Sequence, residues 1–270
     1  MELPSEFSFF KENPEIQYQI IDGLTLPYLY RASSDRKKGP RQYPLIISLH
    51  SMRSNKNPSK ARFSDWNHLQ PFDCYGYKNE TSYWVGSYPE FSLLSGIISV
   101  VEQLKSKGAY NGELYIKAGS SSSYAGVYLA MRLNARALYL SDPILSSKMD
   151  FIPDLKTYKR YTYVFNNSVV DFDAVDLLKP NTKTVFYIVD QRFGYKNLLR
   201  NNSLKFINRC EELGINFKYE VSPDMGHSVP YTLRHVLKFF SSLPKMGVTQ
   251  TGFPDLAHEE GYLFDDVSHL

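Results

Sequence analysis

The sequence predicts an α/β fold with a mostly parallel, doubly wound sheet. Short apolar runs of the length of a buried strand recur along the chain, at Pro44–His50, Ala137–Asp142 and Thr184–Asp190. Longer stretches with apolar residues at helical spacing lie between such runs, for example 91–104 and 203–213. Strands and helices that alternate in this way form parallel sheets covered by helices.

The composition is that of a globular protein. Its 270 residues are 43% apolar and 15% aromatic, and a chain of this size can bury roughly three quarters of its unfolded surface. The net charge of +3 is spread along the chain, and no basic tract marks a nucleic-acid or membrane surface. Two cysteines are too few for a disulfide framework, and no signal peptide or long apolar segment is evident. We therefore expect a cytoplasmic protein with no nucleic-acid or membrane partner.

The chain begins with a hairpin pattern. Residues 15–30 contain two strand-like runs on either side of Asp22-Gly23, a dipeptide that favours a tight β-turn. The buried strand Pro44–His50 follows after a polar loop. Residues 59–90 are aromatic and weakly periodic, and Lys107-Gly108 ends the helix predicted after them.

The central pattern is a strand, a sharp turn and a helix. Apolar residues alternate from Leu114 to Ala118, the alternation breaks at Gly119 and four serines, and a helical pattern follows. A serine on such a turn exposes its hydroxyl beyond the sheet edge, close to the free N–H groups of the helix. Attack on an acyl carbon needs this arrangement, because the N–H after the nucleophile stabilises the oxyanion.

The residues around the turn leave the choice of serine open. A crowded elbow needs small residues two positions before and two positions after the nucleophile. Ser120 has Ala118 and Ser122 at these positions, and Ser121 has Gly119 and Ser123. An ordinary helix with a serine-rich N-terminus is the alternative interpretation of the segment.

The segment Ala118-Gly-Ser-Ser-Ser-Ser-Tyr-Ala125 resembles the nucleophile elbow of α/β-hydrolase enzymes, which often reads small-x-Ser-x-Gly-Gly-aromatic-Ala. The resemblance favours Ser120 as the nucleophile, with Tyr124 four residues after it. Ser122 and Ser123 stand where the pattern has its two glycines, so the turn must accommodate side chains. Because of this departure, a catalytically inactive elbow remains an alternative interpretation.

The resemblance extends to a triad. Ser120, Asp190 and His227 occur in the order Ser, Asp, His of this family, each after a predicted strand. His227 lies in a Gly-His turn between the strand 215–221 and a final helix, where the family has its base. Asp190 ends the strand after which the family usually keeps its carboxylate, and Asp142 at the end of the preceding strand is the alternative.

The segment after Pro44–His50 resembles the His-Gly loop that contributes the second oxyanion N–H in this family. The implied donors are the N–H groups of Ser121 and Met52, with Ser51 as the alternative to Met52. We also predict four substrate contacts, which are His50, Trp66, Tyr77 and Trp84. Packing under a long loop is the alternative for these aromatic side chains.

Two regions lie outside the alternating pattern. Residues 144–183 are long enough for a small lid-like insertion above the site. Their aspartates, Asp171, Asp173 and Asp176, lack the glycine and the terminal glutamate of a calcium loop, so no metal is expected. Residues 1–243 are predicted to form the hydrolase domain, and residues 244–270 a C-terminal tail. The tail is expected to pack on the domain or to contact another subunit, so a homo-oligomer is possible.

The resemblance implies a serine-dependent acyl-ester hydrolase or O-acyltransferase that needs no cofactor. The expected substrate is a small-molecule or carbohydrate ester, for example an acetylated surface polysaccharide. Two alternatives remain: a serine peptidase with the same triad, and a catalytically silent binding protein with the hydrolase fold.

Overall fold

A computed structural model of the chain describes residues 10, 13–35, 38–51, 58–76, 80–86, 91–146, 172–191, 202–222 and 231–244. The chain divides into two compact units, Met1–Pro230 and Tyr231–Leu270. The second unit contains helix α6 (Leu233–Ser242), whose first turn is capped by the Thr232 side chain. Among the described residues, no helix has both the length and the apolar character needed to cross a bilayer.

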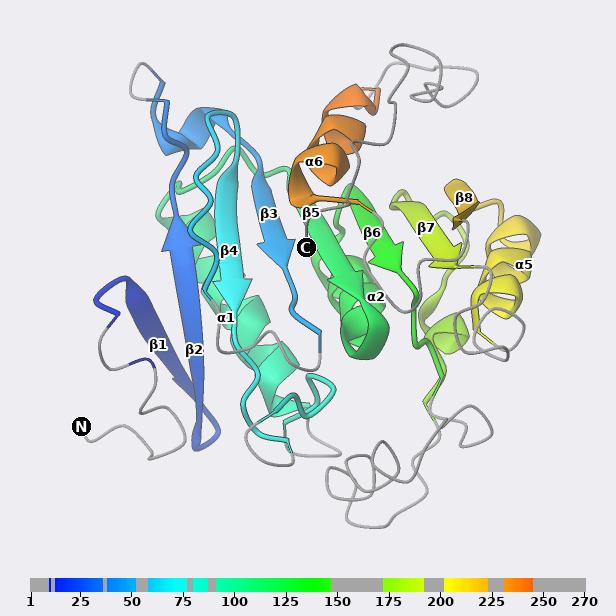
Figure 1. Cartoon of the computed structure of the whole chain (residues 1–270), viewed down its shortest axis with the longest axis horizontal. Coiled ribbons are helices and arrows are strands. Elements are labelled where there is room, and N and C mark those ends of the chain that lie inside the picture. The colour runs from blue at the N-terminus through cyan, green and yellow to red at the C-terminus, as the bar shows by residue number, and fades with distance from the viewer. Residues whose placement is uncertain are drawn as a thin grey trace, which may run out of the picture. The chain divides into compact units, whose positions relative to one another are not determined.

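The first unit is built on an eight-stranded sheet with the strand order β1-β2-β4-β3-β5-β6-β7-β8 (Figure 1). The strands are β1 (Ile16–Ile21), β2 (Leu24–Arg31), β3 (Leu45–Ser48), β4 (Asn67–Pro71), β5 (Leu114–Gly119), β6 (Ala137–Ser141), β7 (Val185–Gln191) and β8 (Phe217–Ser222). The pairs that involve β1 and β2 are antiparallel, and all pairs from β4 to β8 are parallel. The predicted mostly parallel sheet is confirmed, and the carboxyl ends of six strands therefore lie at one edge.

The hairpin of β1 and β2 forms at the predicted dipeptide. Asp22 and Gly23 have φ angles of 47° and 80°, so both residues of the turn are left-handed. A two-residue turn of this kind matches the right-handed twist of the two strands.

Among the described residues of the first unit, three helices share one core. They are α1 (Ser92–Ser106), α2 (Ser123–Leu133) and α5 (Leu204–Glu212), and short 3₁₀ turns lie at η2 (Pro40–Gln42), η4 (Ser120–Ser122) and η6 (Ala174–Leu177). Their apolar faces pack in one cluster with alternate strand residues such as Ile47, Ile116 and Leu138. In Figure 1, α1 and α2 lie behind the sheet. The helix end predicted at Lys107-Gly108 is confirmed, since Gly108 has a φ of 61°.

A close contact sets the position of α2 on β5. A Cβ atom placed on Gly126 would lie 2.7 Å from the Cβ of Ala118 and 3.3 Å from a methyl carbon of Leu138. Only glycine allows this approach without a shift of the helix or the strand. Gly126 therefore helps to fix the helix that begins after the predicted elbow.

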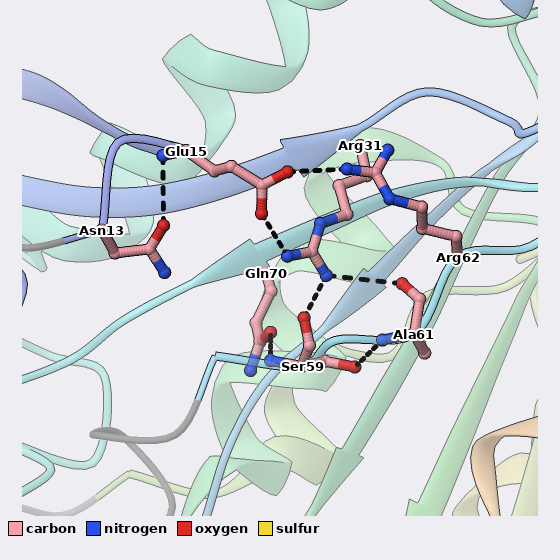
Figure 2. Close-up of polar contacts among 7 residues, drawn as sticks. All are labelled: Asn13, Glu15, Arg31, Ser59, Ala61, Arg62 and Gln70. Carbon is pink, nitrogen blue, oxygen red and sulfur yellow. Dashed lines mark hydrogen bonds and ion pairs between the residues drawn. The ribbon is translucent and has the colours of Figure 1, made fainter.

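A polar network attaches the segment after β3 to β2 (Figure 2). The Arg31 guanidinium donates to the carbonyl of Ser59 and lies 2.5 Å from the Glu15 carboxylate, which also pairs with Arg62 at 2.7 Å. The Ser59 N–H donates to the Gln70 side chain at 2.8 Å. The Arg31 side chain is only 8% exposed, against 58% for Arg62. The buried Arg31 is therefore the main anchor, because exposed ion pairs contribute little.

Most of the predicted lid, residues 147–171, lies outside the described residues, so the lid stays a prediction. The ends of this segment are neighbours, because Ser146 pairs with Asp173 and the Ala174 N–H donates to the Leu145 carbonyl at 2.8 Å. The Asn202 side chain accepts from the N–H groups of Leu145 and Ser146 at 2.8 and 3.0 Å. The chain thus leaves and re-enters the fold at one braced point beside α5.

We predict that Gly126→Val lowers the free energy of unfolding by about 1–3 kcal/mol, because the new side chain must push α2 away from β5. Urea unfolding followed by circular dichroism measures the effect. Gly39→Val is the matched control: Gly39 has a φ of −66° and nothing within 4 Å of an added Cβ. Equal stability of the two variants would contradict the close packing of α2.

Candidate active site

The turn between β5 and α2 has the geometry of a nucleophile elbow. Ser120 follows the last residue of β5 and has a φ of 49°. A residue with a side chain rarely adopts this left-handed conformation, which costs about 1–2 kcal/mol. Such strain persists only where the surrounding structure imposes it, and it is concentrated at functional sites.

Hydrogen bonds hold this strained turn from both sides. The Ser122 hydroxyl accepts from the N–H of Gly119 at 3.0 Å and donates to the carbonyl of the same residue at 2.8 Å. The Ser120 carbonyl accepts from the N–H groups of Ser123 and Ile144, the latter at 3.2 Å. The turn is therefore tied to the start of α2 and to the segment after β6.

The four serines differ in exposure. Ser120 is partly exposed, whereas Ser121, Ser122 and Ser123 are 2%, 0% and 0% exposed. The serines that replace the two glycines of the family pattern have φ angles of −95° and −70°. Neither position needs a left-handed residue, so side chains are accommodated there. Gly119 cannot be replaced in this way, because its Cβ would lie 2.2 Å from the Ser141 hydroxyl oxygen.

Both candidate acids lie at the carboxyl edge of the sheet. Asp190 is the second-last residue of β7, and Asp142 follows β6 with its N–H donating to the Val189 carbonyl at 2.9 Å. They are 3% and 7% exposed. Because β6 and β7 are parallel neighbours, the structure brings these two carboxylates to the same end of adjacent strands.

The Asp190 carboxyl group is in an unfavourable environment for its charged form. The pKa of this group is raised from 3.8 to about 6, mainly by burial and to a smaller extent by the nearby Asp142, although the Ser203 and Tyr219 hydroxyls act to lower it. Those hydroxyls face the carboxylate without reaching hydrogen-bond geometry, and among the described residues the Oδ2 atom of Asp190 has no hydrogen-bond partner. Asp190 therefore has unused capacity to accept a hydrogen bond from a cationic or N–H donor.

His50 and Ser51 follow β3 at the same edge of the sheet. His50 is 6% exposed, and both ring nitrogens bond to the backbone: Nδ1 is 2.9 Å from the Ser51 carbonyl, and Nε2 accepts from the Asp73 N–H at 2.8 Å. Burial lowers the pKa of His50, so its ring is neutral. The Ser51 N–H, one of the two predicted second oxyanion donors, belongs to the first peptide group after this histidine.

The two tryptophans occupy different ends of the sheet. Trp66 precedes β4 and packs edge-on against Tyr115, near the start of β5, with ring centroids 4.9 Å apart. The parallel register places this end away from Ser120, so the structure does not bring Trp66 to the elbow. Trp84 lies beside His50, with ring centroids 4.6 Å apart, and is fully buried. Contact of either tryptophan with substrate stays a prediction.

Three predicted site residues, Met52, Tyr77 and His227, lie outside the described residues. His227 lies in the sequence between β8, which ends at Ser222, and the second unit, which begins at Tyr231. Among the residues that the structure describes, no group of three or more His, Cys, Asp or Glu side chains is arranged to hold a metal ion.

Sequence reasoning missed Asp73, a buried aspartate that organises the loop after β4. It is 0% exposed and accepts hydrogen bonds from the loop 81–84. The sequence did contain a signal for this residue: Asp73 directly follows the short run His68–Phe72, which has the length of a buried strand. The weak periodicity of residues 59–90 made this strand difficult to recognise.

No protein-family model matches the chain, and a search of curated proteins found no similar sequence. Solved structures are similar in fold. The acylaminoacyl peptidase of Pyrococcus horikoshii has a TM-score of 0.65 at 12% identity over 92% of this chain. The chain spans only 46% of the length of that peptidase.

Two other similar structures match over most of both chains. The capsule O-acetyltransferase of Neisseria meningitidis serogroup A has a TM-score of 0.58 at 13% identity, over 82% of this chain and 94% of the transferase. An esterase from the Planctomycetes species Thermogutta terrifontis has a TM-score of 0.52 at 11% identity, over 80% and 86%. The chain has the α/β-hydrolase fold, as the elbow predicts.

We predict that Asp190→Asn becomes more stable relative to the wild type as the pH rises from about 4 to about 7, by about 3 kcal/mol at most. The raised pKa of Asp190 means that the folded wild type binds this proton more tightly than the unfolded chain. Wild-type stability from this group is therefore lost as the pH rises toward 6, and the neutral amide has no such loss. Urea unfolding at several pH values measures both proteins; a constant difference between them would contradict the prediction.

Proposed function

We propose that the chain is a serine-dependent enzyme of carboxylic ester chemistry, which hydrolyses acyl esters or transfers their acyl group to a hydroxyl acceptor. The observation that carries the proposal is the left-handed conformation of Ser120 on a strand-to-helix turn. The partial exposure of Ser120 beside three buried serines supports it as the nucleophile.

In the proposed mechanism, the Ser120 oxygen attacks the ester carbonyl carbon while His227 takes the hydroxyl proton. The tetrahedral oxyanion is stabilised by the N–H of Ser121 and by a second N–H, that of Met52 or Ser51, and one such donor contributes about 3 kcal/mol. The intermediate expels the alcohol, which receives the proton from His227, and an acyl-enzyme remains. Water or an acceptor hydroxyl then attacks the acyl carbon and gives its proton to His227. The second tetrahedral intermediate breaks the bond between the acyl carbon and the Ser120 oxygen, and His227 returns the proton to that oxygen.

Asp190 is the proposed triad acid. Its carboxylate would accept a hydrogen bond from the His227 imidazole and stabilise the positive charge that develops on it. The unused Oδ2 atom of Asp190 and the raised pKa of the group support this role, because a hydrogen-bonded imidazolium would supply the missing stabilisation. Asp142 remains the alternative acid at the end of the neighbouring strand.

The substrate class that we propose is a small-molecule or carbohydrate ester. Similarity to a capsule O-acetyltransferase and to an esterase over most of their lengths supports ester substrates. Similarity to an acylaminoacyl peptidase keeps amide hydrolysis as the second candidate, with the same nucleophile and base. Intact-mass analysis of the acyl-enzyme formed from acetyl esters, followed by addition of water or a sugar acceptor, separates hydrolysis from transfer.

We predict that a fluorophosphonate forms one covalent adduct with the wild-type protein and none with Ser120→Ala, because only an activated serine oxygen displaces fluoride. Intact-mass spectrometry measures the adduct, and circular dichroism checks that the variant is folded. Ser121→Ala is the matched control at a buried neighbour and should still be labelled. An adduct that persists in Ser120→Ala and disappears in Ser121→Ala or Ser122→Ala would identify a different nucleophile. A folded wild type without any adduct would instead favour a silent binding protein.

We further predict that Asp190→Asn lowers kcat for an activated acetyl ester by about 10³- to 10⁴-fold, since the imidazole loses its orienting charge. Asp142→Asn, the same substitution on the adjacent strand, should lower kcat less than about tenfold, because its carboxylate would act only through the local field. Steady-state kinetics on both variants measures the difference. The opposite ranking would make Asp142 the triad acid.

A further inference from the structure

The loop between β4 and α1 is organised by one buried carboxylate. Asp73 accepts hydrogen bonds from the N–H groups of Ser82 and Trp84 at 2.6 and 2.8 Å. It also accepts from the hydroxyls of Thr81 and Ser82 at 2.6 and 2.9 Å. A fully buried carboxylate with this many donors is well satisfied, so the loop 81–84 is held firmly against the end of β4.

The same loop contains strained backbone. Tyr83 and Trp84 have φ angles of 56° and 67°, a conformation that is a clear outlier for bulky side chains. The Asp73 hydrogen bonds to the residues around this point impose it. Because strain of this kind is concentrated where a precise geometry has a function, the placement of Trp84 needs a functional explanation.

The strained conformation brings Trp84 to the backbone after β3. Its indole Nε1 donates to the carbonyl of His50 at 3.1 Å, and its ring lies against the imidazole. The His50 ring holds the next carbonyl, since its Nδ1 is 2.9 Å from the oxygen of Ser51. Nε2 accepts from the Asp73 N–H, so the proton of the neutral ring is on Nδ1, which donates to Ser51.

These bonds fix the direction of the His50 and Ser51 carbonyl groups. In a planar trans peptide, the C=O and the N–H point to opposite sides. The bond from Trp84 to the His50 carbonyl therefore turns the Ser51 N–H away from the indole, and the bond from His50 to the Ser51 carbonyl restrains the same residue from its other side. The Ser51 N–H is one of the two candidates for the second oxyanion donor.

We propose that Trp84, His50 and Asp73 are positioning residues that orient the Ser51 N–H for oxyanion binding before substrate binds. The proposal rests on the proposed serine mechanism and gives His50 and Trp84 a different role from substrate contact. Within the described residues, the polar atoms of both rings make hydrogen bonds to the protein backbone. In this role they act through the oxyanion donor, which binds the transition state more strongly than the substrate.

The test is the inactivation of each variant by a fluorophosphonate, whose phosphoryl oxygen occupies the oxyanion site. Trp84→Phe removes the indole N–H and keeps an aromatic ring beside His50. We expect the maximal inactivation rate to fall by about 10- to 100-fold, since loss of an oxyanion donor has effects up to about 10³-fold. The half-saturating probe concentration should change by less than about twofold, because ground-state binding does not use these bonds.

Tyr30→Phe is the matched control. Its hydroxyl also donates from an aromatic side chain to a backbone carbonyl, that of Ala109, at 2.8 Å, but at the opposite end of the sheet. We expect this variant to be inactivated at the wild-type rate, and thermal unfolding shows whether the two variants lose comparable stability.

A pair of substitutions at His50 tests the imidazole separately. Asparagine places an amide donor near the position of Nδ1, whereas glutamine places its amide near the position of Nε2. We expect His50→Asn to retain about tenfold more of the maximal inactivation rate than His50→Gln, because it keeps the bond to the Ser51 carbonyl.

Three results would overturn the proposal in different ways. Equal inactivation rates for Trp84→Phe and Tyr30→Phe, or for the two His50 variants, would show that these side chains only support the fold. A rise in the half-saturating concentration with an unchanged maximal rate would restore the role in substrate contact. A folded wild type that the probe does not label at all would overturn the proposed function itself.

Discussion

The strained turn at Ser120 is the constraint on which the rest of the site depends. Its left-handed backbone costs free energy, so neighbouring groups must hold it: the Ser122 hydroxyl, the Ile144 N–H and the close approach of Gly119 to Ser141. Strand β5 lies between β3 and β6. The parallel arrangement therefore surrounds the end of β5 with the ends of other strands, and those ends supply both the restraints on the turn and the candidate functional groups.

Two buried aspartates show how burial leads to different chemistry. Asp73 accepts hydrogen bonds from backbone and hydroxyl donors of a single loop, and this set of bonds gives it a structural role. Asp190 is equally inaccessible, but its Oδ2 atom has no hydrogen-bond partner among the described residues, and its pKa is raised to about 6. A carboxylate that the fold leaves incompletely satisfied is suited to orient a base, because a charged partner lowers its free energy.

Left-handed backbone has a different cost at different places in this chain. Asp22, Asn134 and Asn181 are left-handed in turns, where their short polar side chains make this conformation inexpensive. Ser120 lies at the end of β5, and Tyr83 and Trp84 lie in the loop that bonds to the backbone after β3. The left-handed conformation costs more for bulky residues such as Tyr83 and Trp84, and it also occurs at Phe91, which precedes α1.

The sequence by itself determined the features that local patterns encode: the hairpin at Asp22-Gly23, the parallel strands, and the elbow between Leu114 and the helix after it. Apolar periodicity and turn chemistry act over a few residues, so they are readable without a structure. Only the tertiary structure decided which serines are buried, which tryptophan packs against His50 and what Asp73 holds. Those outcomes depend on contacts such as the bond from Trp84 to His50, between residues 34 positions apart. No local pattern encodes such a contact, because it forms only when separate strands end at the same edge of the sheet.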